Sequence, residues 1–185
     1  NKLRKNALSP GTLSLERHRL LWIFLEKETD FFNAKNKILH IAPEQCFYKS
    51  FKKNFESYTT CDLNSPIAEI RADVCNLPFD ENEFDFVLCN HVLEHVYDDE
   101  KAMKEIYRVL KHEGKAILQV PLDNALEKTI DGRDISDQNL RNKLFGQYDH
   151  LRLYGPDYYD KLINVGFKVE KIDQTQKMDK TLIRP

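Results

Sequence analysis

The sequence predicts an α/β protein with a doubly wound, mostly parallel sheet of seven strands and helices on both faces. Short apolar segments alternate with helical patterns along the chain, which favours parallel strands joined by crossover helices. One of these segments, 83–90 (EFDFVLCN), is apolar enough to be covered on both faces. The most unusual polar residues follow the predicted strands, where parallel sheets bind their ligands.

Six of the strands are assigned to short apolar runs. The first run, KILHIAP, stops at Pro43. The runs cover residues 37–43, 57–63, 68–74, 83–90, 115–121 and 167–173. The seventh strand is not assigned to a segment.

The clearest helix is expected to run from Asp98 to a left-handed cap at Gly114. Its apolar residues recur at the spacing of one helix face, and acidic residues stand at its positive end. Ser14 can cap another helix that extends to about Lys27. Two further helices are expected over 48–56 and 156–165.

Composition excludes several classes of function. Hydrophobic residues form 41% and charged residues 31% of the 185-residue chain, as in ordinary globular domains. A net charge of −2 gives no electrostatic footprint for nucleic acid, and no apolar run approaches the ~20 residues that span a bilayer. No secretory signal pattern is visible, and the four cysteines include no Cys-x-x-Cys pair. We therefore expect a cytoplasmic protein with reduced thiols and no nucleic-acid or membrane partner.

Two aspartates follow predicted strands. Asp62 stands about twenty residues beyond the first strand, where nucleoside-binding folds place the carboxylate that accepts both ribose hydroxyls. Asp73 could accept an amino hydrogen of adenine, with the backbone amide of Val74 beside it. Both aspartates also fit a simple turn, because aspartate side chains often accept hydrogen bonds from nearby backbone amides. The local sequence leaves both interpretations open.

The stretch NHVLEHV (90–96) also has two interpretations. His91, Glu94 and His95 have the H-x-x-E-H spacing of inverted zinc peptidases. The same stretch follows a predicted strand and could form the rim of a ligand pocket. A catalytic zinc needs a third protein ligand, and no downstream segment offers a convincing one.

Four fragments, taken in order, resemble the class I S-adenosylmethionine-dependent methyltransferases of the type 11 branch, which includes ubiquinone- and menaquinone-biosynthesis enzymes. They are ILHIAPEQC, CDLN, RADVCNLPFDENEFDFVLCNHVLEHV and YRVLKHEGKAILQVP. The resemblance is strong over 37–121 and weaker over 149–169. It implies a Rossmann-like methyltransferase fold, S-adenosylmethionine as cofactor and S-adenosylhomocysteine as product.

The resemblance also implies the domain organisation. Residues 1–30 would form an N-terminal extension and helix, and 31–185 the methyltransferase-like domain, with 122–150 as a substrate-side insertion or lid. The H-x-x-E-H match then becomes incidental. In some relatives the positions of Ser9 and Thr12 would hold the cysteines of a small zinc element. Both thiols are absent here, so no metal is expected at these positions, and none is expected elsewhere.

Site residues follow from the resemblance by position. The cofactor would contact His40, Ala42, Pro43, Glu44, Asp62, Leu63, Asp73, Val74, Asn90 and His91. The acceptor, expected to be an unidentified small molecule, would contact His95, His150, Arg152 and Tyr154. His91 would be the catalytic base where the acceptor must lose a proton.

The loop after the first strand departs from the family pattern. His40 occupies a position that is usually acidic, and Ala42, Glu44 and Cys46 occupy positions that are usually glycine. Since glycine lets the backbone approach a ligand closely, its loss counts against binding. Glu44 could instead supply the carboxylate that attracts the cofactor's sulfonium and ammonium groups. A non-catalytic S-adenosylmethionine-binding module therefore remains an alternative to the enzyme, and a zinc hydrolase is a less favoured third interpretation.

Overall fold

The computed structural model describes residues 7–177, apart from the side chains of Thr175 and Lys177. The chain divides into two compact units that interleave along the sequence. Among the described residues, the first unit comprises 7–36, 44–57 and 170–177, and the second comprises 37–43 and 58–169. The expected organisation into an N-terminal extension over 1–30 and a methyltransferase-like domain over 31–185 stays a prediction.

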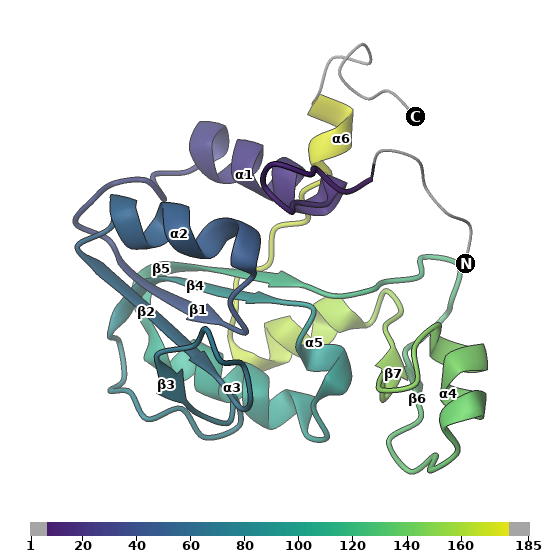
Figure 1. The fold of residues 1–185 in the computed structure, drawn as a ribbon. Coiled ribbons are helices and arrows are strands. Elements are labelled where there is room, and N and C mark those ends of the chain that lie inside the picture. Colours follow the sequence, from purple (N-terminus) through teal and green to yellow (C-terminus); the bar gives the residue numbers. More distant parts are fainter. Residues whose placement is uncertain (1–6, 178–185) are drawn as a thin grey trace. The chain divides into compact units, whose positions relative to one another are not determined.

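The second unit is built on a five-stranded sheet in the order β3-β2-β1-β4-β5 (Figure 1). Parallel pairing joins β1 to β4, β4 to β5 and β2 to β3. The α/β prediction is confirmed, but the described sheet has five strands rather than the expected seven. The strands are β1 (Lys37–Ile41), β2 (Ser57–Asp62), β3 (Ile70–Arg71), β4 (Phe84–Asn90) and β5 (Leu110–Gln119).

Two of the predicted strands are lost or shortened. The segment 167–173 has no regular secondary structure, so the strand expected there is wrong. Its alternating apolar residues Phe167 and Val169 still pack against the core, which explains the period-two pattern without a strand partner. The segment 68–74 is reduced to the two residues of β3.

Helix α3 (Asp99–Val109) lies between β4 and β5 in the sequence. Asp98 caps it by accepting a hydrogen bond from the amide of Lys101, and Met103 and Ile106 are fully buried. The expected extension to a cap at Gly114 is wrong, because β5 begins at Leu110. Together with α5 (Tyr158–Val165), α3 contributes to one continuous apolar core with the central strands.

The polar segment 122–150 is not a long irregular loop. It contains β6 (Ile130–Asp131) and α4 (Gln138–Phe145), and β6 pairs antiparallel with β7 (Arg152–Leu153). A single-turn 3-10 helix, η1 (Leu93–His95), follows β4. Asp157 also anchors the segment 122–150, because its carboxylate accepts hydrogen bonds from the amide and the hydroxyl of Thr129 at 2.7 Å each.

The first unit contains α1 (Glu16–Glu28), α2 (Gln45–Asn54) and α6 (Gln174–Lys177). Ser14 is not the cap of α1, contrary to expectation. The N-cap is Leu15, whose amide donates to the ring of His18 at 3.1 Å. Aromatic contacts hold α1 and α2 together within this unit, and they involve Trp22, Phe31, Phe32, Phe47, Phe51 and Phe55.

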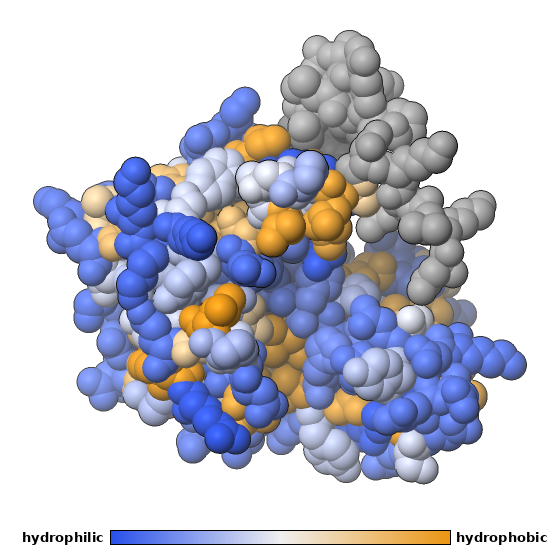
Figure 2. All heavy atoms as spheres, viewed as in Figure 1, coloured by the Kyte–Doolittle hydropathy of each residue, from blue (hydrophilic) through white to orange (hydrophobic). Residues whose placement is uncertain are grey.

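The four cysteines are free thiols, as expected. Burial raises the pKa of Cys46 and of Cys75 to about 11 and that of Cys61 to about 12, so these thiols are protonated at neutral pH. Hydrophilic residues dominate the face drawn in Figure 2. Among the described residues, no helix combines the length and the apolar character needed to cross a membrane.

Candidate functional site

Ala42 and His91 directly follow β1 and β4, two parallel strands that lie side by side in register. Both have a left-handed backbone, with φ of 51° and 55°. Each is fixed by a backbone hydrogen bond, from Ala42 to Cys61 at 2.9 Å and from His91 to Gln119 at 2.8 Å. This conformation costs a non-glycine residue about 1–2 kcal/mol. Such residues concentrate at functional sites, and here they mark the ends of adjacent strands.

The strand order reverses direction between β1 and β4. From β1 the chain proceeds outward to β2 and β3, and it then crosses to the other side for β4 and β5. In open parallel sheets this reversal opens a crevice beyond the carboxyl ends of the strands, and ligands bind there. Ala42 and His91 stand on its two sides.

The left-handed turn at Ala42 gives the glycine-free loop the backbone shape that glycine normally provides. Pro43 is buried directly after it. Glu44 belongs to the first unit, where it is the N-cap residue of α2. Its expected role toward the cofactor stays a prediction.

His40 cannot line an open cleft, because its ring is completely buried. Its Nδ1 shares a 2.8 Å hydrogen bond with the hydroxyl of Tyr58 on β2. The expectation that His40 contacts a cofactor is therefore corrected: this side chain links two neighbouring strands inside the sheet.

Asp62 ends β2, and its carboxylate forms a turn, whereas its role toward a ribose stays a prediction. Its Oδ1 accepts hydrogen bonds from the amides of Asn64 at 2.6 Å and Ser65 at 2.5 Å, so the turn interpretation is correct. Its Oδ2 accepts none from the part of the chain that the structure describes. One carboxylate oxygen therefore fixes the side chain, and the other remains available to a ligand.

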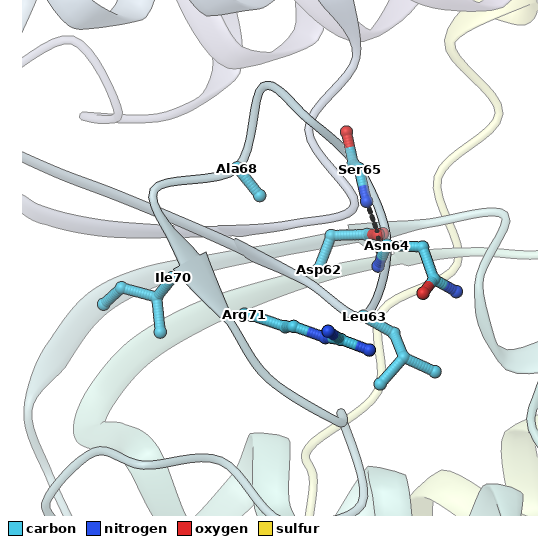
Figure 3. A pocket seen from close by; sticks show the side chains of 7 residues that line it. All are labelled: Asp62, Leu63, Asn64, Ser65, Ala68, Ile70 and Arg71. Atoms are coloured by element: carbon cyan, nitrogen blue, oxygen red, sulfur yellow. Dashed lines mark hydrogen bonds between the residues drawn. The ribbon is translucent and has the colours of Figure 1, made fainter.

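A small pocket adjoins this carboxylate (Figure 3). It measures about 170 Å³ and is lined by residues 62–65 together with Ala68, Ile70 and Arg71. Figure 3 shows the Asp62 carboxylate directed at the backbone of the following turn. Leu63, half exposed, belongs to the same wall.

Asp73 also forms a turn after its strand. Its Oδ1 accepts a hydrogen bond from the amide of Cys75 at 2.8 Å, and the side chain is exposed. Val74 is buried, so only its backbone remains for an adenine to contact. The expected roles of both residues in cofactor binding stay predictions.

His91 and Glu94 form a pair at the end of β4. The Nδ1 of His91 lies 3.2 Å from Oε1 of Glu94. The carboxylate is buried, whereas a third of the imidazole side chain is exposed. A buried carboxylate that holds one ring nitrogen orients the other nitrogen as a base, which is the arrangement that proton-accepting histidines require. Asn90, buried just before His91, ends the strand.

The zinc-peptidase interpretation of this stretch is wrong. Its motif needs both histidines on one face of an α-helix. Instead, His91 has a left-handed backbone, and η1 covers only Leu93–His95. The H-x-x-E-H spacing does not produce the geometry of that metal site.

His95 and His150 come together although 54 residues separate the segments that hold them. Their rings meet edge to face with centroids 4.8 Å apart. His95 is exposed and its Nδ1 lies 3.2 Å from the carbonyl oxygen of Asp149. His150 is buried, and burial, followed by the neighbouring His95, lowers the pKa of its imidazole.

Arg152 and Tyr154 do not face a substrate, contrary to expectation, because both side chains are completely buried. Arg152 donates hydrogen bonds to the carbonyls of Leu93, Val96 and Tyr97 around η1. The sequence gave no sign of this role, since the three acceptors are backbone atoms more than fifty residues away.

The Tyr154 hydroxyl donates to Asp99 at 2.9 Å, and Lys161 donates to the same carboxylate at 2.7 Å. Asp99, which the sequence offered only as a helix-start residue, is therefore the acceptor of a buried network. Because the Tyr154 hydroxyl also lies 3.3 Å from the carbonyl oxygen of Leu93, this network contacts η1.

Comparison with known proteins finds similar sequences and a similar fold. Residues 32–118 match the methyltransferase domain family. The sequence is 48% identical over 60 residues to the uncharacterized protein MJ0638 of Methanocaldococcus jannaschii, a match that covers 32% of this chain and 26% of that protein. It is 44% identical over 52 residues to the 2-phytyl-1,4-naphtoquinone methyltransferase of Nostoc punctiforme, covering 28% and 23%. These matches span about a quarter of each relative's length.

A solved structure shares the fold at low sequence identity. It is a SAM-dependent methyltransferase from Archaeoglobus fulgidus, which superposes with a TM-score of 0.59 at 14% identity and covers 87% of this chain and 76% of that one. The sheet described above is thus of a recurring Rossmann-like type, and the fold expected from the sequence is confirmed.

Proposed function

We propose that this chain, whose residues 32–118 match the methyltransferase domain family, binds S-adenosylmethionine and transfers its methyl group to a small molecule. One observation carries the proposal: Ala42 and His91 end adjacent parallel strands with the same left-handed backbone. The chain turns sharply away at both tips, which supports a ligand site at the reversal of strand order. The left-handed backbone costs about 1–2 kcal/mol at each of the two residues, and both residues lie where a cofactor would bind.

Asp62 suits the ribose of this cofactor. Its Oδ1 is held by two backbone amides, so the carboxylate is already oriented before a ligand arrives. Its second oxygen would accept a hydrogen bond from a ribose hydroxyl. A hydrogen bond to a charged acceptor contributes about 1.5–3 kcal/mol.

Methyl transfer is an in-line displacement in which the acceptor atom attacks the methyl carbon while the sulfur departs with the bonding electron pair. Orientation alone supplies much of the acceleration, since well-aligned pairs reach effective molarities of about 10⁵ M or more. When the acceptor must also lose a proton, His91 is the group positioned to take it. Glu94 holds Nδ1, so Nε2 is the nitrogen that would receive the proton.

A small-molecule acceptor is supported by relatives that include quinone methyltransferases. Methylation of a ring carbon beside a hydroxyl in a reduced quinone releases one proton, which suits a histidine base. The exposed edge of His91 gives such a ring access to that base.

A non-catalytic nucleoside-binding module is the second candidate, and two observations favour it. The Cβ of Ala42 occupies space that a glycine would leave to the ligand. The pocket beside Asp62, at about 170 Å³, is smaller than the roughly 300–1,000 Å³ of ordinary small-molecule sites. Binding of S-adenosylmethionine without turnover would distinguish this module from the enzyme.

Calorimetric titration with S-adenosylhomocysteine tests the cofactor site. In Asp62→Asn the side-chain oxygen still accepts from the turn amides, but the charge is gone. We expect affinity to fall about 10- to 100-fold. Asp80→Asn, at an exposed aspartate that does not line the pocket, is the control and should bind like the wild type. No binding by the wild type, or equal binding by Asp62→Asn, contradicts the proposed site.

Turnover is tested separately with a methyl-labelled cofactor and a panel of reduced naphthoquinones, phenols and amines. Label in an extracted product supports the enzyme, and tight cofactor binding with no label in any product supports the binding module.

The Glu44→Gln variant tests the prediction that Glu44 attracts the charged groups of the cofactor. If this variant binds S-adenosylmethionine more weakly than the wild type does, the result supports a charge role for Glu44. Equal affinity of the variant and the wild type would rule that role out.

A further inference from the structure

We propose that Glu94, His95 and His150 form a binding site for one divalent transition-metal ion of the zinc class. Each residue offers one ligand atom, and the three atoms lie within 4.8 Å of one another. Two imidazoles and one carboxylate are a donor set that Zn²⁺ accepts readily, with a fourth position left for water or another ligand. A contraction of the cluster on binding would bring all three atoms to coordination distance.

The cluster contains two buried polar atoms that lack a hydrogen-bond partner in the described chain. They are Oε2 of Glu94 and Nδ1 of His150. Glu94 is 1% exposed and His150 is 3% exposed, so water reaches neither residue freely. A buried polar atom without a partner is costly, and a bound cation would satisfy both atoms together.

In Glu94 and His95, the polar atom that would not bind the metal has a partner of its own. Oε1 of Glu94 is engaged by Nδ1 of His91 at 3.2 Å, which leaves Oε2 for a metal. Nδ1 of His95 lies 3.2 Å from the carbonyl oxygen of Asp149, which leaves Nε2. In metal-binding histidines the N–H of the second ring nitrogen commonly donates a hydrogen bond to a carbonyl or carboxylate oxygen. This bond fixes both the tautomer and the orientation of the ring.

His150 is suited to the role by its environment. Its side chain is buried, and Nδ1 has no hydrogen-bond partner in the described chain. A metal binds an imidazole through the lone pair of a ring nitrogen, and Nδ1 of His150 is a ring nitrogen that no group of the described chain engages.

The ion would connect two distant segments at one end of the sheet. Glu94 and His95 belong to η1, whereas His150 precedes β7. A backbone hydrogen bond from Leu151 to the carbonyl of Glu94, at 2.8 Å, already joins these segments. A metal held there would also fix the carboxylate that orients His91. The inference does not depend on methyl transfer or on cofactor binding.

Equilibrium dialysis of the tag-free chain against ZnCl₂, followed by metal analysis, tests the site directly. We expect one zinc ion per chain and a rise in the thermal unfolding temperature with added zinc. His95→Gln is the deciding variant, since this partly exposed side chain can change without opening the core. It should weaken zinc binding more than about a hundredfold, because loss of a direct ligand costs at least as much as loss of an outer contact.

His150→Gln should have the same effect, and His91→Gln a smaller one of about 10- to 100-fold through loss of the Glu94 partner. His112→Gln is the matched control, because that histidine is 94% exposed and outside the cluster. Zinc binding by His95→Gln with wild-type stoichiometry and affinity overturns the proposal. So does a wild-type chain that retains no zinc after dialysis. Titration with S-adenosylhomocysteine in parallel keeps a failure here separate from a failure of the cofactor site.

Discussion

The amide of Ala42 donates a hydrogen bond to the carbonyl oxygen of Cys61 at 2.9 Å, although φ of Ala42 is 51°. This bond holds the chain in a left-handed turn immediately after β1. An alanine in this conformation has no steric advantage over glycine, so the surrounding structure maintains it. The loop lacks the glycine residues that the resemblance to methyltransferases leads one to expect, yet Ala42 adopts the backbone conformation that favours glycine.

Replacing this alanine by glycine should therefore stabilise the protein. The left-handed conformation costs alanine about 1–2 kcal/mol, and the greater freedom of glycine in the unfolded chain offsets about 0.4–1 kcal/mol. We expect Ala42→Gly to raise the free energy of unfolding by up to about 1 kcal/mol in urea denaturation. Ala125→Gly, in an exposed turn without positive φ, is the control and should lower it by about 0.5 kcal/mol. Equal destabilisation by both changes would contradict the strain at Ala42.

Asp99 is expected to be essential to the stability of the second unit. It is 2% exposed and receives hydrogen bonds from Tyr154 and Lys161, with Arg152 3.7 Å away. Asp99→Asn leaves the buried guanidinium without its countercharge, which should cost about 3 kcal/mol. Urea unfolding at pH 7 measures this. The exposed Asp160→Asn on α5 is a suitable control and should change stability little. A loss below about 1 kcal/mol would show that the network is not stabilising.

The same carboxylate should make folding sensitive to acid. Burial alone would raise the pKa of Asp99, but the hydrogen bond from Lys161 and the charge of Arg152 outweigh burial and hold it below 3.8. Since the folded pKa is depressed, the contribution of Asp99 is present above the ordinary pKa and disappears as pH falls through the folded value. The wild type should therefore lose stability more steeply than Asp99→Asn below about pH 4. Parallel acid-unfolding curves would contradict this linkage.

The central strands could be predicted from the sequence because their signal is local. Segments 37–43 and 83–90 are apolar on both faces, and β1 and β4 formed within them. The positions of Asp62 and His91 at strand ends followed directly from that assignment. The end of α3 could not be predicted, because Leu110 pairs with Phe84 in the sheet instead of continuing the helix. That competition between a local cap and a distant partner is absent from the pattern around Gly114.

The contacts around η1 could not be predicted either, because they also depend on partners that are distant in the sequence. Arg152 looked like an anion-binding residue, yet its partners are three carbonyls around η1. Likewise, the motif spacing joined His91 to His95, whereas the fold joins His95 to His150. Contacts between side chains and distant backbone leave no periodic trace in a single sequence.

Gly155 is expected to resist substitution because the backbone of Lys128 and Thr129 lies against it. A Cβ at this position would lie 2.6 Å from the carbonyl carbon of Lys128 and 2.9 Å from the amide nitrogen of Thr129. Gly155→Ala should therefore lower stability by about 1–3 kcal/mol. Gly11→Ala, where a Cβ meets nothing within 4 Å, is the control. Differential scanning calorimetry compares the two variants, and an unchanged unfolding temperature for Gly155→Ala would show that the backbone at Lys128 and Thr129 moves away easily.

Arg152→Met should be among the most damaging single changes. The side chain is fully buried, and its removal leaves the carbonyls of Leu93, Val96 and Tyr97 without their donor. Methionine fills similar volume but offers no N–H group, so we expect a loss of about 3–5 kcal/mol in the free energy of unfolding. Arg133→Met is the matched control, since that arginine is ion-paired with Asp131 near the surface and should contribute less than about 1 kcal/mol. Similar urea midpoints for the two variants would show that the buried guanidinium does not hold η1. A large difference would identify Arg152 as the residue that supports the segment carrying Glu94.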